Sequence, residues 1–337
     1  MRERALREGA ERNLQQKGDE FNQIFGRWKQ TAQELSDLHM QQNAVYTVTD
    51  ERLRELATTL RSGIRNFAMG FFSGSPGSVD RIPSRSGGGD DYFRQYMAPI
   101  EGHEKYLLSD RRCSSIIQAF LWRVLDRQVF DCYHWAGEAA DSAKQLSSRL
   151  KTHGQPEERG QPRDPDAERN LQMWNASMAR FLLEAIDAGE VSKDRQATEA
   201  KLRGVLTQIV TAIQPFCRAP QDELKYLEED LWHVLESAVA LDKEISKQMA
   251  RIERVFEVEN SSTRSKGAPT FDSSWMELES GQEPVTSQRR IGLVVAPAIV
   301  KFGKSNGEDP AVRTLLVPME VSIEPMPESR SERSRGS

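Results

Sequence analysis

Hydrophobic residues recur at every seventh position through the first 43 residues of the chain. The repeat is carried by Leu14, Phe21, Trp28 and Leu35, and its second position holds Ile24, Thr31 and Leu38. A strict period of seven favours a helix that supercoils against another helix. Glycines at positions 9, 18 and 26 weaken this helix, so we expect it to need a partner. The pattern predicts a coiled-coil-like helix over residues 1–43 with an interaction seam formed by Leu14, Phe21, Ile24, Trp28, Leu35 and Leu38.

Residues 44–258 predict a helical domain, because apolar residues repeat there at helical spacing. The apolar face from Ile116 to Val129 is wide, which indicates a central helix. Glycine, proline and polar residues predict flexible loops near 73–91 and 152–165. Asp50 is expected to cap the helix that starts there. The longest helix is expected from Asp222 to Val258, where a seven-residue repeat has one polar break and implies a rod of about 50 Å.

The period changes near the C-terminus. Residues 259–290 are polar and predict a linker, whereas residues 291–325 contain short β-prone runs around a turn at Asn306-Gly307. Pro297 and Pro318 are expected to keep these strands short or at an edge, and the segment is expected to dock on the helices. Residues 326–337 predict a disordered tail. The fold class is therefore mainly α: an irregular helical bundle with two long coiled-coil-like helices and a small C-terminal β hairpin.

Composition narrows the classes of partner. The chain has 337 residues, 46 basic against 51 acidic, and a net charge of -5, which gives no general attraction to nucleic acid or to anionic membranes. No apolar stretch approaches the length of a membrane-spanning helix, and the charged first residues do not resemble a secretory signal. These features predict an intracellular protein, cytoplasmic or nuclear. Three well-separated cysteines without a CxxC argue against a disulfide framework or a structural zinc site.

Three sets of segments carry a resemblance. They are Leu60 to Phe67, Phe120 to Phe130 with Trp135-Ala-Gly137, and Val295 to Gly303 with Gly307-Glu308. Together they resemble a group of uncharacterised filamentous-fungal proteins, which join an N-terminal coiled coil to a helical domain. The resemblance implies a fungal intracellular protein. It implies no activity, because none is known for the group, and no residue role is carried over.

Several motifs suggest chemistry, but a simpler interpretation suits each of them better. Gly303-Lys304-Ser305 lacks the earlier glycine and the following helix of a phosphate-binding loop. The pairs Asp131 with His134 and Asp230 with His233 have spacing found at metal sites, but His233 is expected on a solvent-facing side of its helix. Cys132 and His134 are two residues apart and point in different directions on a helix. We therefore expect no catalytic residues, no metal and no cofactor.

Two hypotheses of function follow from these patterns. The first is a non-catalytic protein–protein interaction or scaffold protein that associates with itself or with another protein through the seam, and a chain that buries the seam internally would be monomeric. The alternative is an enzyme or small-ligand binder with an aromatic pocket between the central helices. Its expected lining is Trp122, Cys132, Trp135 and Trp174, with Arg123 holding an anionic group.

Overall fold

The computed structural model describes residues 17, 48–74, 88–97, 106–109, 112–153, 165–188, 191–220, 223–257, 270–279 and 289–323. The chain separates into two compact units, Met1–Thr47 and Val48–Ser337. Lys17, exposed and helical, is the part of the first unit that is described. The six residues of the predicted seam and the predicted tail at 326–337 lie outside the described residues.

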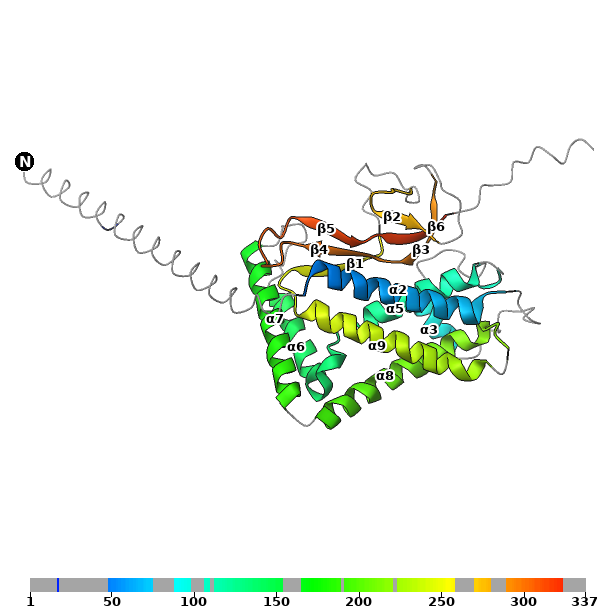
Figure 1. Ribbon diagram of the computed structural model, residues 1–337, viewed down its shortest axis with the longest axis horizontal. Helices are drawn as coiled ribbons and strands as arrows, with labels where there is room; N and C mark the ends of the chain where they lie inside the picture. The colour runs from blue at the N-terminus through cyan, green and yellow to red at the C-terminus, as the bar shows by residue number, and fades with distance from the viewer. Residues whose placement is uncertain are drawn as a thin grey trace, which may run out of the picture. The chain divides into compact units, whose positions relative to one another are not determined.

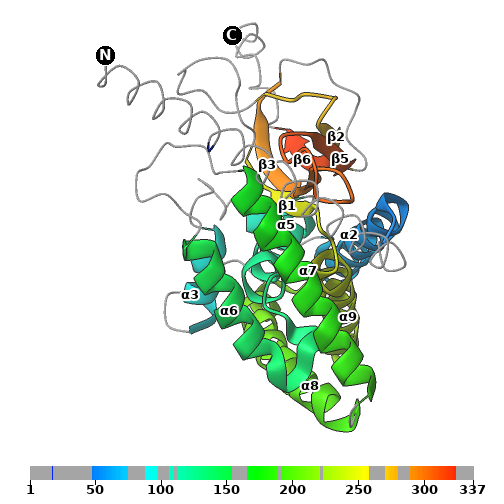
Figure 2. The ribbon, with the colours of Figure 1, turned by 90° about the vertical axis from the view of Figure 1, so that its left-hand side faces the viewer.

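Helices dominate the described part of the second unit, as the sequence predicted. The α-helices are α2 (Asp50–Phe72), α3 (Gly88–Met97), α5 (Cys113–Gln128), α6 (Ala140–His153), α7 (Pro165–Ala188), α8 (Val191–Ile213) and α9 (Leu227–Ser246). Short 3₁₀ helices are η2 (His134–Ala139), η3 (Gln214–Phe216) and η4 (Leu224–Tyr226). Figure 1 shows α2 and α9 extending alongside each other, and Figure 2 shows α7 passing close to α6 and α9.

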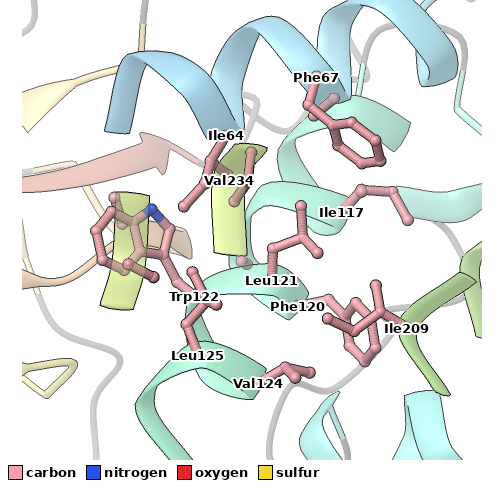
Figure 3. Packing of buried hydrophobic residues seen from close by; sticks show 14 of the residues in the cluster. Ile64, Phe67, Ile117, Phe120, Leu121, Trp122, Val124, Leu125, Ile209 and Val234 are labelled. Carbon is pink, nitrogen blue, oxygen red and sulfur yellow. The ribbon is translucent and has the colours of Figure 1, made fainter. Parts of the chain in front are cut away.

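The main hydrophobic core surrounds α5. The apolar side chains of this helix from Ile116 to Leu125 are almost completely inaccessible to solvent, which agrees with the wide apolar face seen in the sequence. Ile64 and Phe67 of α2, Val234 of α9 and Ile209 of α8 converge on α5 (Figure 3). Each large side chain buried in this way contributes about 1.5–3 kcal/mol. The core therefore fixes α2, α5, α8 and α9 as one body.

The start of α2 differs in detail from the expectation. Thr49, not Asp50, is the N-cap: its side chain accepts a hydrogen bond from the backbone N–H of Arg52 at 3.2 Å. Asp50 lies in the first turn, where its carboxylate accepts from Lys301 Nζ at 2.6 Å. A threonine cap and an acidic first turn both stabilise a helix N-terminus.

The prediction of one helix from Asp222 to Val258 is wrong. The α-helix α9 has 20 residues, about 30 Å, and the chain becomes strand β1 at Arg251–Val255. Ile252 and Val255, which fit the seven-residue repeat, instead point to opposite sides of β1 and pack in two different clusters. Side chains three positions apart point to opposite faces of a strand but lie on the same face of a helix, so the repeat at this point fits either element.

The described strands form two small sheets instead of one small hairpin. They are β1, β2 (Met276–Leu278), β3 (Ile291–Ala296), β4 (Ala298–Phe302), β5 (Arg313–Val317) and β6 (Met319–Ile323). One sheet has the order β1-β4-β5 and the other β2-β6-β3; β2 is parallel to β6 and every other pair is antiparallel. The first sheet lies beside α2 (Figure 1), and a second cluster of apolar residues draws on both sheets.

Pro297 and Pro318 mark where the chain passes from one sheet to the other. Pro297 separates β3 from β4 and Pro318 separates β5 from β6, in line with the expected shortening of strands at proline. Arg61 of α2 donates to the carbonyl oxygens of Pro297 at 3.0 Å and Pro318 at 2.6 Å, and it pairs with Glu277. The buried guanidinium thereby ties α2 to both crossing points.

The two predicted loops and the predicted linker each overlap a helix or a strand of the structure. The predicted loop at 73–91 overlaps α3, which begins at Gly88, and the predicted linker at 259–290 contains β2. The second predicted loop, 152–165, overlaps the ends of α6 and α7, with Pro165 as the first residue of α7. Short, polar helix ends and a three-residue strand carry little hydrophobic periodicity, so their sequences resemble loops.

Candidate functional site

The segment after α5 holds an unusual backbone. Asp131 and Tyr133 have φ angles of 58° and 56°, in the left-handed region that residues with a Cβ rarely adopt. For a bulky residue such as tyrosine this conformation costs about 1–2 kcal/mol, so the surroundings must hold it in place. The backbone N–H of Asp131 donates to Asp242 Oδ1 at 2.9 Å, and the Tyr133 hydroxyl contacts Ser147 Oγ at 3.2 Å. Such strained residues cluster at functional sites.

Asp242 is a charged residue type buried inside the bundle. It lies on α9 with 1% of its surface exposed. Burial raises the pKa of Asp242 to about 7, although the hydrogen bond from Asp131 and the nearby Arg254 and Trp135 side chains favour its ionised form. A carboxyl group with a pKa near 7 can gain or lose a proton near neutral pH.

Arg254 of β1 connects this loop to α5. Its Nε donates to Asp126 at 2.9 Å and its Nη2 to Asp131 at 3.0 Å, while the guanidinium lies 4.8 Å from the centre of the Phe130 ring. Burial lowers the pKa of Arg254, but its two carboxylate partners outweigh that effect and hold the pKa above its usual value. Arg254 therefore stays charged and fixes the geometry of the loop.

A polar pocket opens beside these groups, between α5, α7, the end of α9 and β1. We name it the α7–β1 pocket; its volume is about 390 Å³. Its charged lining consists of Asp126, Asp131, Glu168, Arg251, Glu253 and Arg254, and its amide and hydroxyl lining of Gln172, Asn175, Ser246 and Gln248. Arg251 resembles Arg254 in having two acidic partners, Glu168 at 3.2 Å and Glu253. The pocket is thus a place where polar groups from four elements converge.

The five residues expected to form an aromatic pocket do not line this one. Trp122 is 1% exposed and belongs to the main core (Figure 3), and the Arg123 guanidinium lies 5.2 Å from the centre of the Phe256 ring. Trp135 packs against Tyr133 in a separate cluster, and Trp174 is half-buried on α7. Cys132 is buried next to Lys144, whose Nζ is 3.2 Å from the sulfur.

Cys132 and His134 have separate environments. Burial raises the pKa of the Cys132 thiol, with Lys144 opposing this effect. Burial lowers the pKa of His134, whose Nε2 lies 2.7 Å from the carbonyl oxygen of Gln128. A reactive thiol needs a lowered pKa, whereas burial keeps the pKa of this thiol above its ordinary value even with Lys144 beside it. The arrangement does not support a cysteine nucleophile.

Other sequence motifs are also placed by the structure. His233 is exposed, with Nδ1 at 3.3 Å from Glu236, as expected for a solvent-facing side of α9. In the described part of the chain, no group of three or more His, Cys, Asp or Glu side chains is arranged to hold a metal ion. Lys304 pairs with Asp309 at 2.6 Å in a loop that leads into β5 instead of a helix, so Gly303-Lys304-Ser305 is no phosphate-binding loop.

A second buried polar cluster ties helices to the sheets. Arg65 of α2 donates to Glu320 Oε1 at 2.6 Å, and Glu320 is 0% exposed on β6. Ser115 of α5 donates to Glu279, where burial raises the pKa and the serine hydrogen bond opposes that effect. Together with the pair of Arg61 and Glu277, these contacts form a structural link from α2 and α5 to strands β2 and β6.

A wider hollow of about 690 Å³ follows the polar side of α2 between Glu51 and Asn66. Its described walls come from this one helix, so it brings together no groups from different elements. The α7–β1 pocket remains the better candidate site among the described residues.

Most of this pocket was not predicted from the sequence. Gln248 gave a signal as the polar break in the seven-residue repeat, and Asp131 was noted only for its spacing to His134. The other lining residues come from segments far apart in the sequence, and ordinary surface positions also hold such residue types.

The fold and site define a mainly helical protein with small C-terminal sheets and a polar pocket between helices and strand β1. No protein-family model matches the chain, and no curated protein or solved structure is significantly similar to it. In the part of the chain that the structure describes, no helix is long and apolar enough to cross a membrane.

Proposed function

We propose that the protein is a non-catalytic interaction or scaffold protein that self-associates through its N-terminal seam. The observation that carries the proposal is the seven-residue recurrence of Leu14, Phe21, Trp28 and Leu35 within Met1–Thr47, a unit of its own. A single helix cannot cover its own hydrophobic stripe, and isolated helices gain most of their stability from packing. A partner helix is therefore part of the proposal.

The driving force is the removal of the seam from water. Each large side chain that becomes fully buried contributes about 1.5–3 kcal/mol before the costs of ordering and association are subtracted. A charge placed at the centre of the seam would have to be desolvated together with its neighbours. Two such charges should abolish association.

The described residues support a binding role over catalysis. The three cysteines, Cys113, Cys132 and Cys217, all have pKa values raised by burial, which disfavours the reactive thiolate. His134 is held by a backbone carbonyl, away from the cysteine two residues before it. Cys132 and His134 therefore do not form a nucleophile–base pair.

The test compares two variants of the full chain by light scattering coupled to size exclusion. The seam variant carries Phe21→Asp and Trp28→Asp, and the matched control carries Gln23→Asp and Gln30→Asp, which add the same charge two positions beyond the seam residues. We expect the wild type and the control to have at least twice the mass of one chain and the seam variant to have the mass of one chain. A wild type with the mass of one chain at micromolar concentration would overturn the proposal.

A further inference from the structure

The α7–β1 pocket has an excess of negative charge. Its lining includes four carboxylates, those of Asp126, Asp131, Glu168 and Glu253, but two guanidinium groups, those of Arg251 and Arg254. Each arginine pairs with two of the carboxylates, so neither is left to attract an anion. Carboxylates therefore outnumber guanidinium groups in this lining, which favours a cationic occupant.

An unpaired hydrogen-bond acceptor lies in the pocket wall. Gln248 is 2% exposed, and its side-chain Oε1 has no hydrogen-bond partner. Its amide nitrogen, Nε2, donates to the carbonyl oxygen of Glu244 at 3.5 Å. Because the amide nitrogen faces Glu244, the amide oxygen Oε1 points away from Glu244. Asn175, on the α7 wall, likewise has a buried Oδ1 without a partner. Buried acceptors of this kind need donors, and the pocket wall supplies none to these two atoms.

The walls of the pocket are held in place before any ligand arrives. Arg254 is fixed by two carboxylates, and the hydrogen bond from Asp131 to Asp242 holds the left-handed loop. A preorganised wall loses little conformational freedom on binding, which favours affinity. The volume of about 390 Å³ lies near the lower end of the usual range for small-molecule sites, roughly 300–1,000 Å³.

From these observations we infer that the α7–β1 pocket binds a small organic cation that carries several N–H donors, an ammonium or guanidinium compound. The carboxylates supply the attraction, and Gln248 and Asn175 accept the N–H groups. The acidic side chains do not meet as a group of three suited to a metal ion in the described part of the chain. The inference is independent of self-association through the seam.

The test is isothermal titration calorimetry of the full-length protein with three probes at low salt. Agmatine has a guanidinium and an ammonium group, choline has a positive charge without N–H donors, and succinate has negative charge. We expect agmatine to bind one site per chain, choline to bind at least tenfold more weakly, and succinate not to bind. Absence of agmatine binding at millimolar concentration would overturn the inference, and so would equal binding of choline.

Two variants locate the site. Gln248→Met keeps the side-chain volume but removes the acceptor, and Gln208→Met, at an exposed position on α8, is its control. Losing one hydrogen bond to a charged group should weaken agmatine binding about tenfold to a hundredfold, whereas the control should bind as the wild type does. Glu253→Gln, at a partly exposed position, should weaken binding without a large change in folding. Unchanged affinity in both pocket variants would place agmatine elsewhere and refute the assignment.

Discussion

Replacing Asp242 with asparagine should change how the stability of the protein depends on pH. The carboxyl is buried on α9, and burial raises its pKa to about 7 in the folded protein. In the unfolded chain an aspartate titrates near pH 3.9. Because one pKa unit corresponds to about 1.4 kcal/mol, ionising Asp242 costs up to about 4 kcal/mol more in the folded protein than in the unfolded chain.

The sign follows from which state binds the proton. Between about pH 4 and pH 7 the folded protein keeps a proton on Asp242 that the unfolded chain has lost, so stability decreases as the pH rises through this range. Above about pH 7 the effect is constant. His134 acts in the opposite direction, because its lowered pKa reduces stability as the pH falls below about 6.5, but this contribution is common to wild type and variant.

The asparagine side chain of the Asp242→Asn variant is neutral at every pH and still offers an oxygen to the N–H of Asp131. Urea unfolding of wild type and variant at pH 4 and pH 8 measures the effect as a difference between the two proteins. We expect the free energy of unfolding of the variant minus that of the wild type to be larger at pH 8 than at pH 4, by up to about 4 kcal/mol. Asp230→Asn, at an exposed position on the same helix, is the control for loss of a charge. A difference that is the same at both pH values, or that changes in the opposite direction, would refute the reasoning.

Two further predictions concern stability and use urea unfolding near neutral pH. Arg61→Ala should lower the free energy of unfolding by about 2–5 kcal/mol, because two proline carbonyl oxygens lose their donor at about 1–3 kcal/mol each, whereas Arg52→Ala removes an exposed pair and should lower it by less than about 1 kcal/mol. Similar losses in both variants would contradict the role given to Arg61. Gly137→Ala should lower the free energy of unfolding by several kcal/mol, since the new Cβ would lie 2.7 Å from Asp194 Cα at a residue with a φ of 56°. The control Gly70→Ala, whose new Cβ meets nothing within 4 Å, should raise the free energy of unfolding by about 1 kcal/mol. A tolerated Gly137→Ala would show that η2 and α8 can separate.

The sequence correctly predicted those elements whose hydrophobic pattern fits only one type of secondary structure. The wide apolar face of α5 was recognised as central because a helix buried on several sides needs apolar residues around most of its circumference. Ile252 and Val255 were misread because their spacing fits both a helical seam and a strand with two buried faces. Local periodicity cannot choose between these alternatives; pairing of β1 with β4, almost 50 residues later, decides it.

The candidate site was not predictable in the same way. The expected pocket was built from tryptophans, and the structure places Trp122 in the closed core. The α7–β1 pocket depends on distant contacts, such as that between Asp131 and Asp242. A charged residue next to a helix seam is normally solvated, so nothing near Asp242 in the sequence indicated that it would be buried.

Two buried polar clusters among the described residues differ in which of their atoms lack a hydrogen-bond partner. In the cluster between α2 and the sheets, the unpaired buried atoms include donors, Arg61 Nε and Arg65 Nε, as well as an acceptor, Glu320 Oε2. Small shifts or a water molecule can satisfy such a mixture from within, which suits a structural link. In the α7–β1 pocket, Gln248 and Asn175 both present acceptors. Two acceptors cannot satisfy each other, so their donors must come from outside the protein, from water or from a ligand, and a ligand with N–H groups can displace such water by supplying the same hydrogen bonds.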